Sequence, residues 1–286
     1  MPWVISDSLQ DYSATAEGLV RANAGPNVIL LGAAEALRVR GLGAFGPGGP
    51  LFGWWQPPGG GPVRAAFLHS PPFPVALTSM TADIAAELAQ ALASRGRALG
   101  GVNADQPAAT AFAAAWHELT GDTVEESMRS RLYQLGRLRA PEPFPPGQAR
   151  VAGPADRSLL VAWSAAFGQE ARTGPRNVAA TVDDRLSYRG YTLWEQDGQP
   201  VSVAGLTRQV AGQVRVGPVY TPPRHRGRGY GGAVTWAVSQ AARAAGAAQV
   251  VLFTDLANPT SNALYQRLGY QPVADRRVLA FKKKGG

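Results

Sequence analysis

The stretch of the chain best suited to chemistry is a glycine-rich, basic turn at residues 219–232. An extended segment ends there, and an amphipathic helix is predicted to begin at about Gly229. Glycines let the backbone approach an anion closely, and the N–H groups and dipole of a helix N-terminus attract negative charge. Because Arg224, Arg226 and Arg228 lie in the same turn, the pattern predicts a phosphate-binding site. An ordinary surface turn between a strand and a helix is the alternative.

A dinucleotide-binding motif is the first interpretation to test for this turn. Gly227, Gly229 and Gly232 match G-x-G-x-x-G, and Asp255 follows at about the spacing expected of a ribose ligand. However, that motif begins directly at a strand end, whereas two prolines and three basic residues intervene here at 222–226. The residues that remain after the turn are also too few for the rest of a doubly wound sheet. The sequence therefore argues against NAD.

Two motifs in the second half resemble the GNAT family of N-acetyltransferases. Residues 226–231 fit R/Q-x-x-G-x-G/A, the loop that holds the pyrophosphate of acyl-CoA in that family. Residues 258–270 resemble the second family signature, in which Asn258 is followed seven residues later by Tyr265 and then by Leu-Gly-Tyr. The motifs occur in the family's order, separated by one predicted helix and one predicted strand. The resemblance covers roughly residues 148–282.

The resemblance implies an acetyl-CoA site around the strand expected at 214–221. In the family two central strands separate, and the pantetheine arm pairs with the strand that precedes the loop. Gly217 and Pro218 suit a bulge at which regular pairing is broken. The residues implied to contact acetyl-CoA come from this strand, the loop and one downstream side chain: Val219, Tyr220, Thr221, Arg224, Arg226, Gly227, Arg228, Gly229, Tyr230, Gly231, Gly232 and Asn258.

The implied reaction is direct transfer of an acetyl group to a primary amine in a ternary complex. The neutral amine attacks the thioester carbonyl, a backbone N–H polarises the carbonyl oxygen, and an acid protonates the departing thiolate. By resemblance, Tyr265 is that general acid. The chain has no cysteine, which excludes an acyl-cysteine intermediate. No general base is evident, and Asp255 and Glu170 are the candidates.

Each of these roles has a structural or functional alternative. Tyr265 could be a core tyrosine on a short helix, and Asp255 could cap the turn before Ser261. The three histidines lack the spacing of metal ligands, so no metal is expected. A non-catalytic acyl-CoA-binding or regulatory module is the first rival function. Nucleic-acid binding through the basic half is the second, but the aromatic residues are not interleaved with the basic ones as in single-strand binders.

The elements that must position these residues divide the chain into two halves. A length of 286 residues suits two domains, and the prolines of 140–147 predict an extended connector. We expect a first domain at 1–140, a Pro-rich linker at 141–147 and the catalytic domain at 148–286. Each domain is expected to be α/β (α+β), with a mixed, mostly antiparallel twisted sheet flanked by helices, as the resemblance implies.

Hydrophobic periodicity and turn residues predict the individual elements. In the first half we expect helices near 13–20, 33–39, 81–94 and 107–119, and strands near 51–55, 63–69 and 98–102. In the second half we expect helices near 156–167, 229–245 and 261–268, and strands near 148–152, 191–195, 200–207, 213–221, 249–254 and 273–281.

The first half is interpreted as a degenerate copy of the second. Sliding the sequence by 152 residues aligns Pro107 with Pro259 near the start of a helix. The same shift aligns Tyr265 with Ala113, and the glycine loop has no counterpart in the first half. We therefore expect a copy that has lost CoA binding and that shapes the pocket for the amine acceptor.

The charge of the chain is unevenly distributed. The formal net charge is +8, but residues 1–147 hold ten Arg against twelve acidic residues, whereas residues 148–286 hold fifteen Arg and three Lys against eight acidic residues. This excess suggests an anionic ligand for the second half, and Lys282–Lys284 reads as a solvated tail. Neither a secretory signal nor a transmembrane run is evident. We expect a soluble, cytoplasmic protein with no membrane or nucleic-acid partner. The amine acceptor and the oligomeric state are left open.

Overall fold

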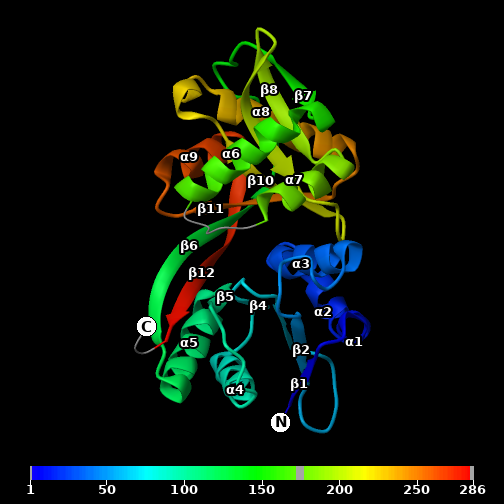
Figure 1. Cartoon of the computed structure of the whole chain (residues 1–286), viewed down its shortest axis with the longest axis vertical. Helices are drawn as coiled ribbons and strands as arrows, with labels where there is room; N and C mark the ends of the chain where they lie inside the picture. Colours follow the sequence, from blue (N-terminus) through cyan, green and yellow to red (C-terminus); the bar gives the residue numbers. More distant parts are fainter. Residues whose placement is uncertain (1, 172–176, 284–286) are drawn as a thin grey trace. The chain divides into compact units, whose positions relative to one another are not determined.

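The computed structural model describes residues 2–171 and 177–283 and divides into two compact units (Figure 1). The first unit consists of Met1–Leu132, Asp255–Ala257 and Val273–Gly286, and the second of Tyr133–Thr254 and Asn258–Pro272. This division differs from a simple split into halves because two long strands, β6 (Thr123–Leu135) and β12 (Tyr270–Lys282), each contribute residues to both units. The last strand in the sequence therefore lies mostly in the first unit.

The first unit is a mixed sheet with helices on both faces. Strands β1 to β4 pair in antiparallel order, β4 pairs with β5 in parallel, and β12 adds to β5 in antiparallel register, from Arg276 opposite Asp105 to Ala280 opposite Gly101. Its other elements are β1 (Trp3–Ser6), α1 (Leu9–Thr15), α2 (Glu17–Ala22), α3 (Val28–Arg40), β2 (Leu51–Trp55), β3 (Ala65–His69), β4 (Val75–Leu77), α4 (Ala82–Ala93), β5 (Gly101–Asp105) and α5 (Gln106–Thr120).

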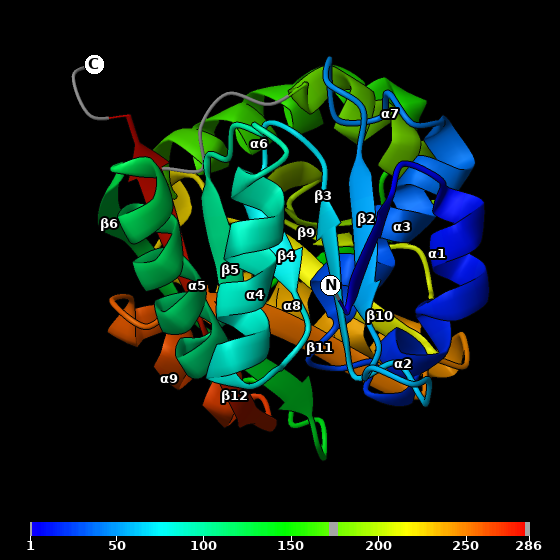
Figure 2. The same cartoon turned by 90° about the horizontal axis from the view of Figure 1, so that it is seen from below.

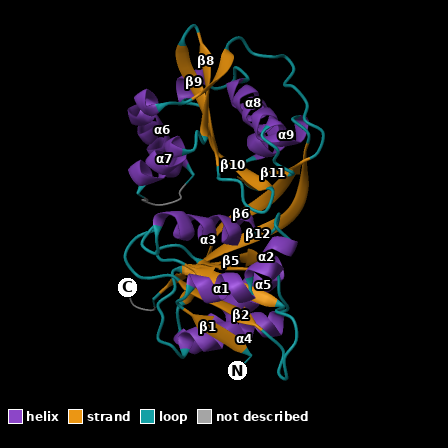
Figure 3. Cartoon of the chain, turned by 90° about the vertical axis from the view of Figure 1, so that its right-hand side faces the viewer, coloured by secondary structure: helices purple, strands orange, loops and turns teal. Residues whose placement is uncertain are grey.

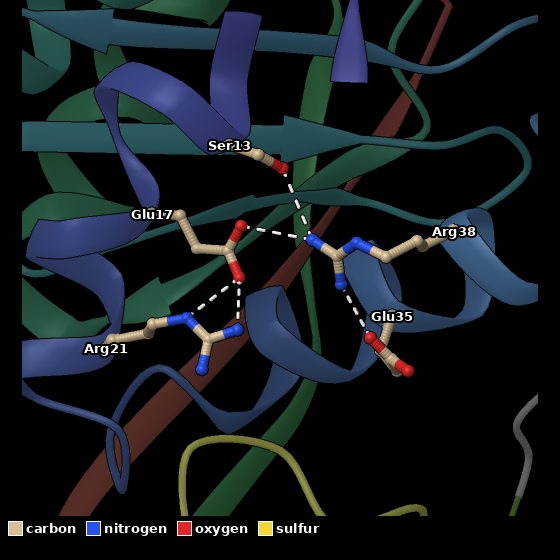
Figure 4. Close-up of polar contacts among 5 residues, drawn as sticks. All are labelled: Ser13, Glu17, Arg21, Glu35 and Arg38. Carbon is tan, nitrogen blue, oxygen red and sulfur yellow. Dashed lines mark hydrogen bonds and ion pairs between the residues drawn. The ribbon is translucent and has the colours of Figure 1, made fainter. Parts of the chain in front are cut away.

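Successive side chains of the first sheet point to opposite faces, and each face packs against a layer of helices. Helices α4 and α5 cover one face (Figure 2), where Phe67 and Leu279 join a continuous apolar cluster. On the other side, the ring of Tyr12 in α1 packs 5.2 Å from that of Phe52 in β2. A polar cluster ties the helices of this second layer together, because the buried Glu17 of α2 accepts from Arg21 and from Arg38 of α3 (Figure 4).

The second unit repeats the same order of elements. Strands β7 to β10 are antiparallel neighbours, and β10 pairs with β11 in parallel. Helices α6 and α7 lie on one side of β8 to β10, and α8 and α9 on the other (Figure 3). The elements are β7 (Gln148–Val151), α6 (Arg157–Glu170), α7 (Val178–Ser187), β8 (Tyr191–Gln196), β9 (Gln199–Leu206), β10 (Gln213–Tyr220), α8 (Tyr230–Ala244), β11 (Gln249–Asp255) and α9 (Pro259–Arg267), with short 3₁₀ turns at Pro154–Asp156 and Pro223–His225.

Each unit therefore has a mixed, mostly antiparallel sheet flanked by helices, and the predicted fold class is confirmed. Three strands that the sequence patterns did not predict, β1, β4 and β6, complete the first unit. With them, the first unit has the same succession as the second: antiparallel strands, then a parallel pair joined through one helix, then a further helix.

The proline-rich segment expected to be an extended linker is packed against the second unit. The ring of Phe144 lies edge-on to Trp194 and to Trp236, at 5.7 and 5.4 Å between ring centroids. The indole N–H of Trp194 also donates a hydrogen bond to the carbonyl of Pro146 at 3.0 Å. The segment therefore contacts β8 and α8, although the Phe144 side chain stays 47% exposed.

The first lysine of the basic C-terminal run belongs to a strand, and its side chain is exposed. Lys282 is part of β12, and its Nζ lies 2.6 Å from a carboxylate oxygen of Glu125 in β6. Lys284 falls outside the described residues. Within the described ranges, no helix is both long and apolar enough to cross a membrane.

Candidate active site

The central strands of the second unit separate where an acyl-CoA site was predicted. The parallel pairing of β10 with β11 runs from Gln213–Gln249 to Val216–Leu252 and ends there, although β10 continues to Tyr220 and β11 to Asp255. On its other side β10 keeps its pairing with β9, with a register shift between Val216 and Val219. The bulge predicted at Gly217 and Pro218 is thus present, and it lies where the parallel pairing ends.

The loop after β10 leads directly into the N-terminus of α8. Gly227 and Gly229 have φ angles of +75° and +82°, a left-handed conformation that residues with a side chain adopt only at a cost. Gly229 is the N-cap, and the N–H of Ala233 makes the first bond of the helix by donating to the Gly229 carbonyl. The N–H groups just before Ala233 precede the helical ladder, so they are available to an anion at this end. The side chain of Tyr230, in contrast, is buried and donates to Gln196.

The three arginines of the loop are not equivalent. Arg226 is held within the protein, because its Nε donates to the Thr221 carbonyl at 2.9 Å and its Nη2 lies 2.8 and 2.6 Å from the two carboxylate oxygens of Glu170. Arg224 donates to the ring of His225 at 3.0 Å. Desolvation and the charges of Arg224 and Arg228 lower the pKa of His225. The exposed Arg228 adds positive charge at the mouth of the loop.

Glu170, one of the two candidate bases, lies at the end of α6 as the counterion of Arg226. Its carboxylate also accepts from the Tyr220 hydroxyl at 3.4 Å. Burial and the nearby Glu170 charge raise the pKa of Tyr220. The Tyr220 ring in turn packs 6.2 Å from Trp163 of α6. A role for Glu170 as a base would require its ion pair with Arg226 to open first.

Tyr265, the predicted general acid, lies on the buried face of α9. It is 8% exposed, and its ring meets Tyr270 edge-on at a centroid distance of 6.0 Å. Burial raises the pKa of Tyr265 to about 12, so the hydroxyl is protonated at neutral pH. Asn258 caps α9 through its Oδ1, which accepts from the Ser261 N–H at 3.0 Å.

Asp255, the second candidate base, stabilises the turn that follows β11. Its Oδ1 accepts from the N–H of Ala257 at 2.9 Å, and the side chain is exposed. The next residue, Leu256, donates to the carbonyl of Arg129 at 2.9 Å. Asp255 belongs to the first compact unit, whereas the glycine loop and Tyr265 belong to the second.

Ser202 of β9 supports the end of β10, and the sequence motifs did not identify it. Its hydroxyl donates to the Tyr220 carbonyl at 3.1 Å and lies 2.8 Å from the hydroxyl of Thr221. Ser202 is fully buried. The only sequence signal was a hydroxyl residue within the apolar run from Val201 to Ala204.

A pocket lies in the first unit, apart from the predicted acetyl-CoA contacts. A cavity of about 510 Å³ in the first unit is formed by α5, β6 and β12, and none of the predicted acetyl-CoA contacts lines it. Glu126 and Arg277 contribute its charged groups, and they are bonded to each other. Among the described residues, no group of three or more His, Asp or Glu could hold a metal ion.

Comparisons with known proteins agree with the geometry of the second unit. The sequence profile of the Acetyltransferase (GNAT) family matches residues 159–270, which include both motifs. A search of curated proteins finds no match.

Several solved structures are similar to the whole chain. A GCN5-related N-acetyltransferase from Sphaerobacter thermophilus is 18% identical with a TM-score of 0.65, and the match covers 100% of this chain and 97% of that one. A GNAT-family acetyltransferase from Colwellia psychrerythraea is 12% identical with a TM-score of 0.61, over 99% and 100% of the two chains. A tandem GNAT protein from the clavulanic acid biosynthesis pathway is 16% identical with a TM-score of 0.58, over 99% and 98%.

At these identities the structural matches establish the fold alone. The family profile locates the family in the second half, where the parallel strands separate beside the glycine loop. Residues 159–270 therefore belong to the GNAT acetyltransferase family, within a chain that has the fold of a tandem GNAT protein.

Proposed function

We propose that this chain is an N-acetyltransferase that moves an acetyl group from acetyl-CoA to a primary amine by direct transfer in a ternary complex. The observation that carries the proposal is the early end of the β10–β11 pairing, at Val216 and Leu252, immediately before the glycine loop. A separated strand offers backbone groups to the pantetheine amides, and the N-terminus of α8 offers N–H groups to the pyrophosphate. Both features occur at one end of one sheet.

The donor site follows from this arrangement. The backbone of Val219–Thr221 pairs with the pantetheine arm, and Ser202 holds this end of β10 in place from β9. The amides of residues 227–232 surround the pyrophosphate, and Arg224 and Arg228 add positive charge. Arg226 reaches the phosphates only when Glu170 releases it, because the two are paired in the free protein.

The chemistry requires one proton donor and one proton acceptor. The amine nitrogen attacks the thioester carbon, the C–S bond breaks, and the Tyr265 hydroxyl gives its proton to the thiolate of CoA. The raised pKa of Tyr265 keeps that proton in place until the thiolate forms. The proton lost by the amine passes to water or to a carboxylate, with Glu170 and Asp255 as the candidates, and Tyr265 regains a proton from solvent.

The experiment that tests the proposal measures the release of free thiol from acetyl-CoA against a library of primary amines. Tyr265→Phe is expected to lower turnover by about 100-fold or more while acetyl-CoA affinity is unchanged. Tyr270→Phe is the matched control, because it removes a buried hydroxyl from the ring next to Tyr265. Unchanged turnover in Tyr265→Phe across the pH range would remove Tyr265 as the acid.

Binding of acyl-CoA without turnover is the second candidate function. The burial of Tyr265 in the apolar cluster of α8 and α9 favours it, since a core tyrosine needs no catalytic role. Saturable acetyl-CoA binding with no thiol release from any amine would support this function. A gel shift that depends steeply on salt and is competed poorly by CoA would instead indicate nucleic-acid binding.

A further inference from the structure

The first unit contains a buried arginine whose hydrogen-bond partners are all uncharged. Arg276 of β12 is 3% exposed. Its Nη2 donates to the Asn103 carbonyl at 2.8 Å and to the Leu77 carbonyl at 3.2 Å, and its Nε donates to the Asn103 side-chain oxygen at 3.0 Å. Its Nη1 lies 3.3 Å from the carbonyl of Pro26. Burial lowers the pKa of Arg276 to about 10, so the guanidinium is still charged at neutral pH.

The position of this guanidinium in the sheet is informative. Strands β4 and β5 are the parallel pair of the first unit, and their pairing consists of Val75–Val102 and Ala76–Asn103. Leu77 is the last residue of β4, and the following Thr78 turns toward β3, where its N–H donates to the Ala66 carbonyl. The Arg276 side chain thus bridges the two strands where their direct pairing ends.

The same place in the second unit is the end of the β10–β11 pairing, where the proposed acetyl-CoA site lies. There the strand leads into a glycine loop before α8. In the first unit, residues 78–81 alone connect β4 to α4, and they contain no glycine. In both units the parallel pairing ends before the second strand of the pair does, at Ala76–Asn103 in the first unit and at Val216–Leu252 in the second. However, β10 runs on for four residues to Tyr220, whereas β4 ends one residue later, at Leu77.

We propose that Arg276 is a built-in plug, which fills in the first unit the opening that acetyl-CoA enters in the second, so that the chain binds one acetyl-CoA. This inference rests on the proposed function. Separating two strands leaves carbonyl groups without partners, and a buried carbonyl that lacks a donor is costly. The guanidinium supplies donors to Leu77 and Asn103, which makes the separation stable with no ligand present.

The stoichiometry of binding tests the plug in the unmodified chain. Titration calorimetry with acetyl-CoA is expected to give one site per chain. Hydrogen exchange is expected to show acetyl-CoA protecting residues 219–232 while leaving 75–81 and 101–105 unchanged. Two sites per chain, or protection of residues 75–81, would overturn the plug but leave the proposed function standing. No binding of acetyl-CoA at all would overturn the proposed function, and with it the equivalence of the two openings.

Chemical rescue tests the role of the guanidinium itself. Arg276→Ala is expected to lower the melting temperature by roughly 5–10 °C, and ethylguanidinium at millimolar concentration is expected to restore part of that loss. Arg277→Ala is the matched control, since this neighbour on β12 is bonded to Glu126 and Thr110. Ethylguanidinium should stabilise neither the wild type nor Arg277→Ala. Absence of rescue in Arg276→Ala overturns the plug, and if that variant does not fold, Arg276→Gln takes its place in the same assay.

Discussion

The two units have the same succession of strands and helices but differ where their parallel strands end. In the second unit the strands lead into a loop of left-handed glycines and exposed arginines. In the first unit the connection to α4 is short, and Arg276 bridges the strands. The same succession of elements thus has two arrangements at the end of its parallel pair. In the proposed function a ligand bonds to the backbone of the second unit, whereas in the first unit the Arg276 side chain bonds to both strands.

The helices that follow the parallel strands extend the comparison to the position of Tyr265, the proposed general acid. Asp105 caps α5 by accepting from the Ala108 N–H, as Asn258 caps α9 by accepting from the Ser261 N–H, both at 3.0 Å. Counting seven residues from each cap pairs Tyr265 with Phe112, one residue away from the Ala113 expected from sliding the sequence. Phe112 is fully buried and has no hydroxyl, so this position of the first unit holds no acid.

The largest expected effect concerns the glycine at the start of α8. Gly229→Glu places a side chain on a backbone with φ +82° and a negative charge where the pyrophosphate is proposed to bind. Acetyl-CoA affinity should fall by about 100-fold or more, as measured by calorimetry. Thr81→Glu, at the exposed N-cap of α4 in the first unit, is the matched control and should leave the affinity unchanged. Undiminished binding by Gly229→Glu would remove the loop from the donor site.

A smaller effect is expected from the polar cluster of the first unit. Glu17 is 8% exposed and holds Arg21 and Arg38 at 2.6 and 3.0 Å (Figure 4). Glu17→Gln should lower the free energy of unfolding by roughly 1–3 kcal/mol, measured by urea denaturation, without changing acetyl-CoA affinity. The control is Asp183→Asn, which removes an exposed ion pair with Arg157 in the second unit and should change the free energy of unfolding much less than Glu17→Gln does.

The Glu17 contribution should also depend on pH. Burial opposes ionisation, but hydrogen bonds from Arg21 and Ser13 and the charge of Arg38 lower the pKa of Glu17 below its ordinary value of 4.5. The stabilisation is therefore complete above pH 4.5 and is lost as the pH falls through the lower value of the folded state. Melting temperatures of the wild type and Glu17→Gln should converge on acidification. A difference in melting temperature that stays constant as the pH falls would contradict the ionised Glu17 carboxylate as the source of the stabilisation.

The smallest expected effect concerns Glu170 and Arg226 in the second unit. Their ion pair is about half exposed, and it engages an arginine of the proposed pyrophosphate loop. Glu170→Gln should free Arg226 and raise acetyl-CoA affinity by about two- to five-fold. In an Arg226→Gln background, Glu170→Gln should leave the acetyl-CoA affinity unchanged. A weaker affinity in Glu170→Gln would show that the carboxylate positions Arg226 for the phosphates, and a large loss of turnover alone would favour its role as the base.

The sequence predicted the strands around the second unit's candidate site more completely than the fold of the first unit. The predicted strands 213–221 and 249–254 agree with β10 and β11 because both are apolar and end at turn residues. In contrast, β4 has three residues beside a proline-rich turn, and the first half of β6 is exposed and contains Glu125 and Glu126. Apolar and polar residues do not alternate along either strand. Sequence patterns therefore could not predict the full set of strands in the first unit.

Arg276 shows why such a contact escapes sequence reasoning. An arginine in a strand normally predicts a solvated face, yet its partners Asn103 and Leu77 lie 173 and 199 residues earlier. Only the register of β12 against β5 brings them together. The boundaries of the two units could not be predicted from the sequence for a similar reason. They depend on where two long strands pass from one unit to the other.

The placement of β12 has a consequence for how the chain is made. The first unit is translated first, but its sheet is complete only when β12 covers the edge of β5. At 5–20 residues per second, the 173 residues between Asn103 and Arg276 take roughly 10–35 s to synthesise. During that interval β5 presents an unpaired edge, which favours association with chaperones or with neighbouring nascent chains. The unit whose synthesis begins first therefore cannot complete its sheet until nearly the whole chain has been made.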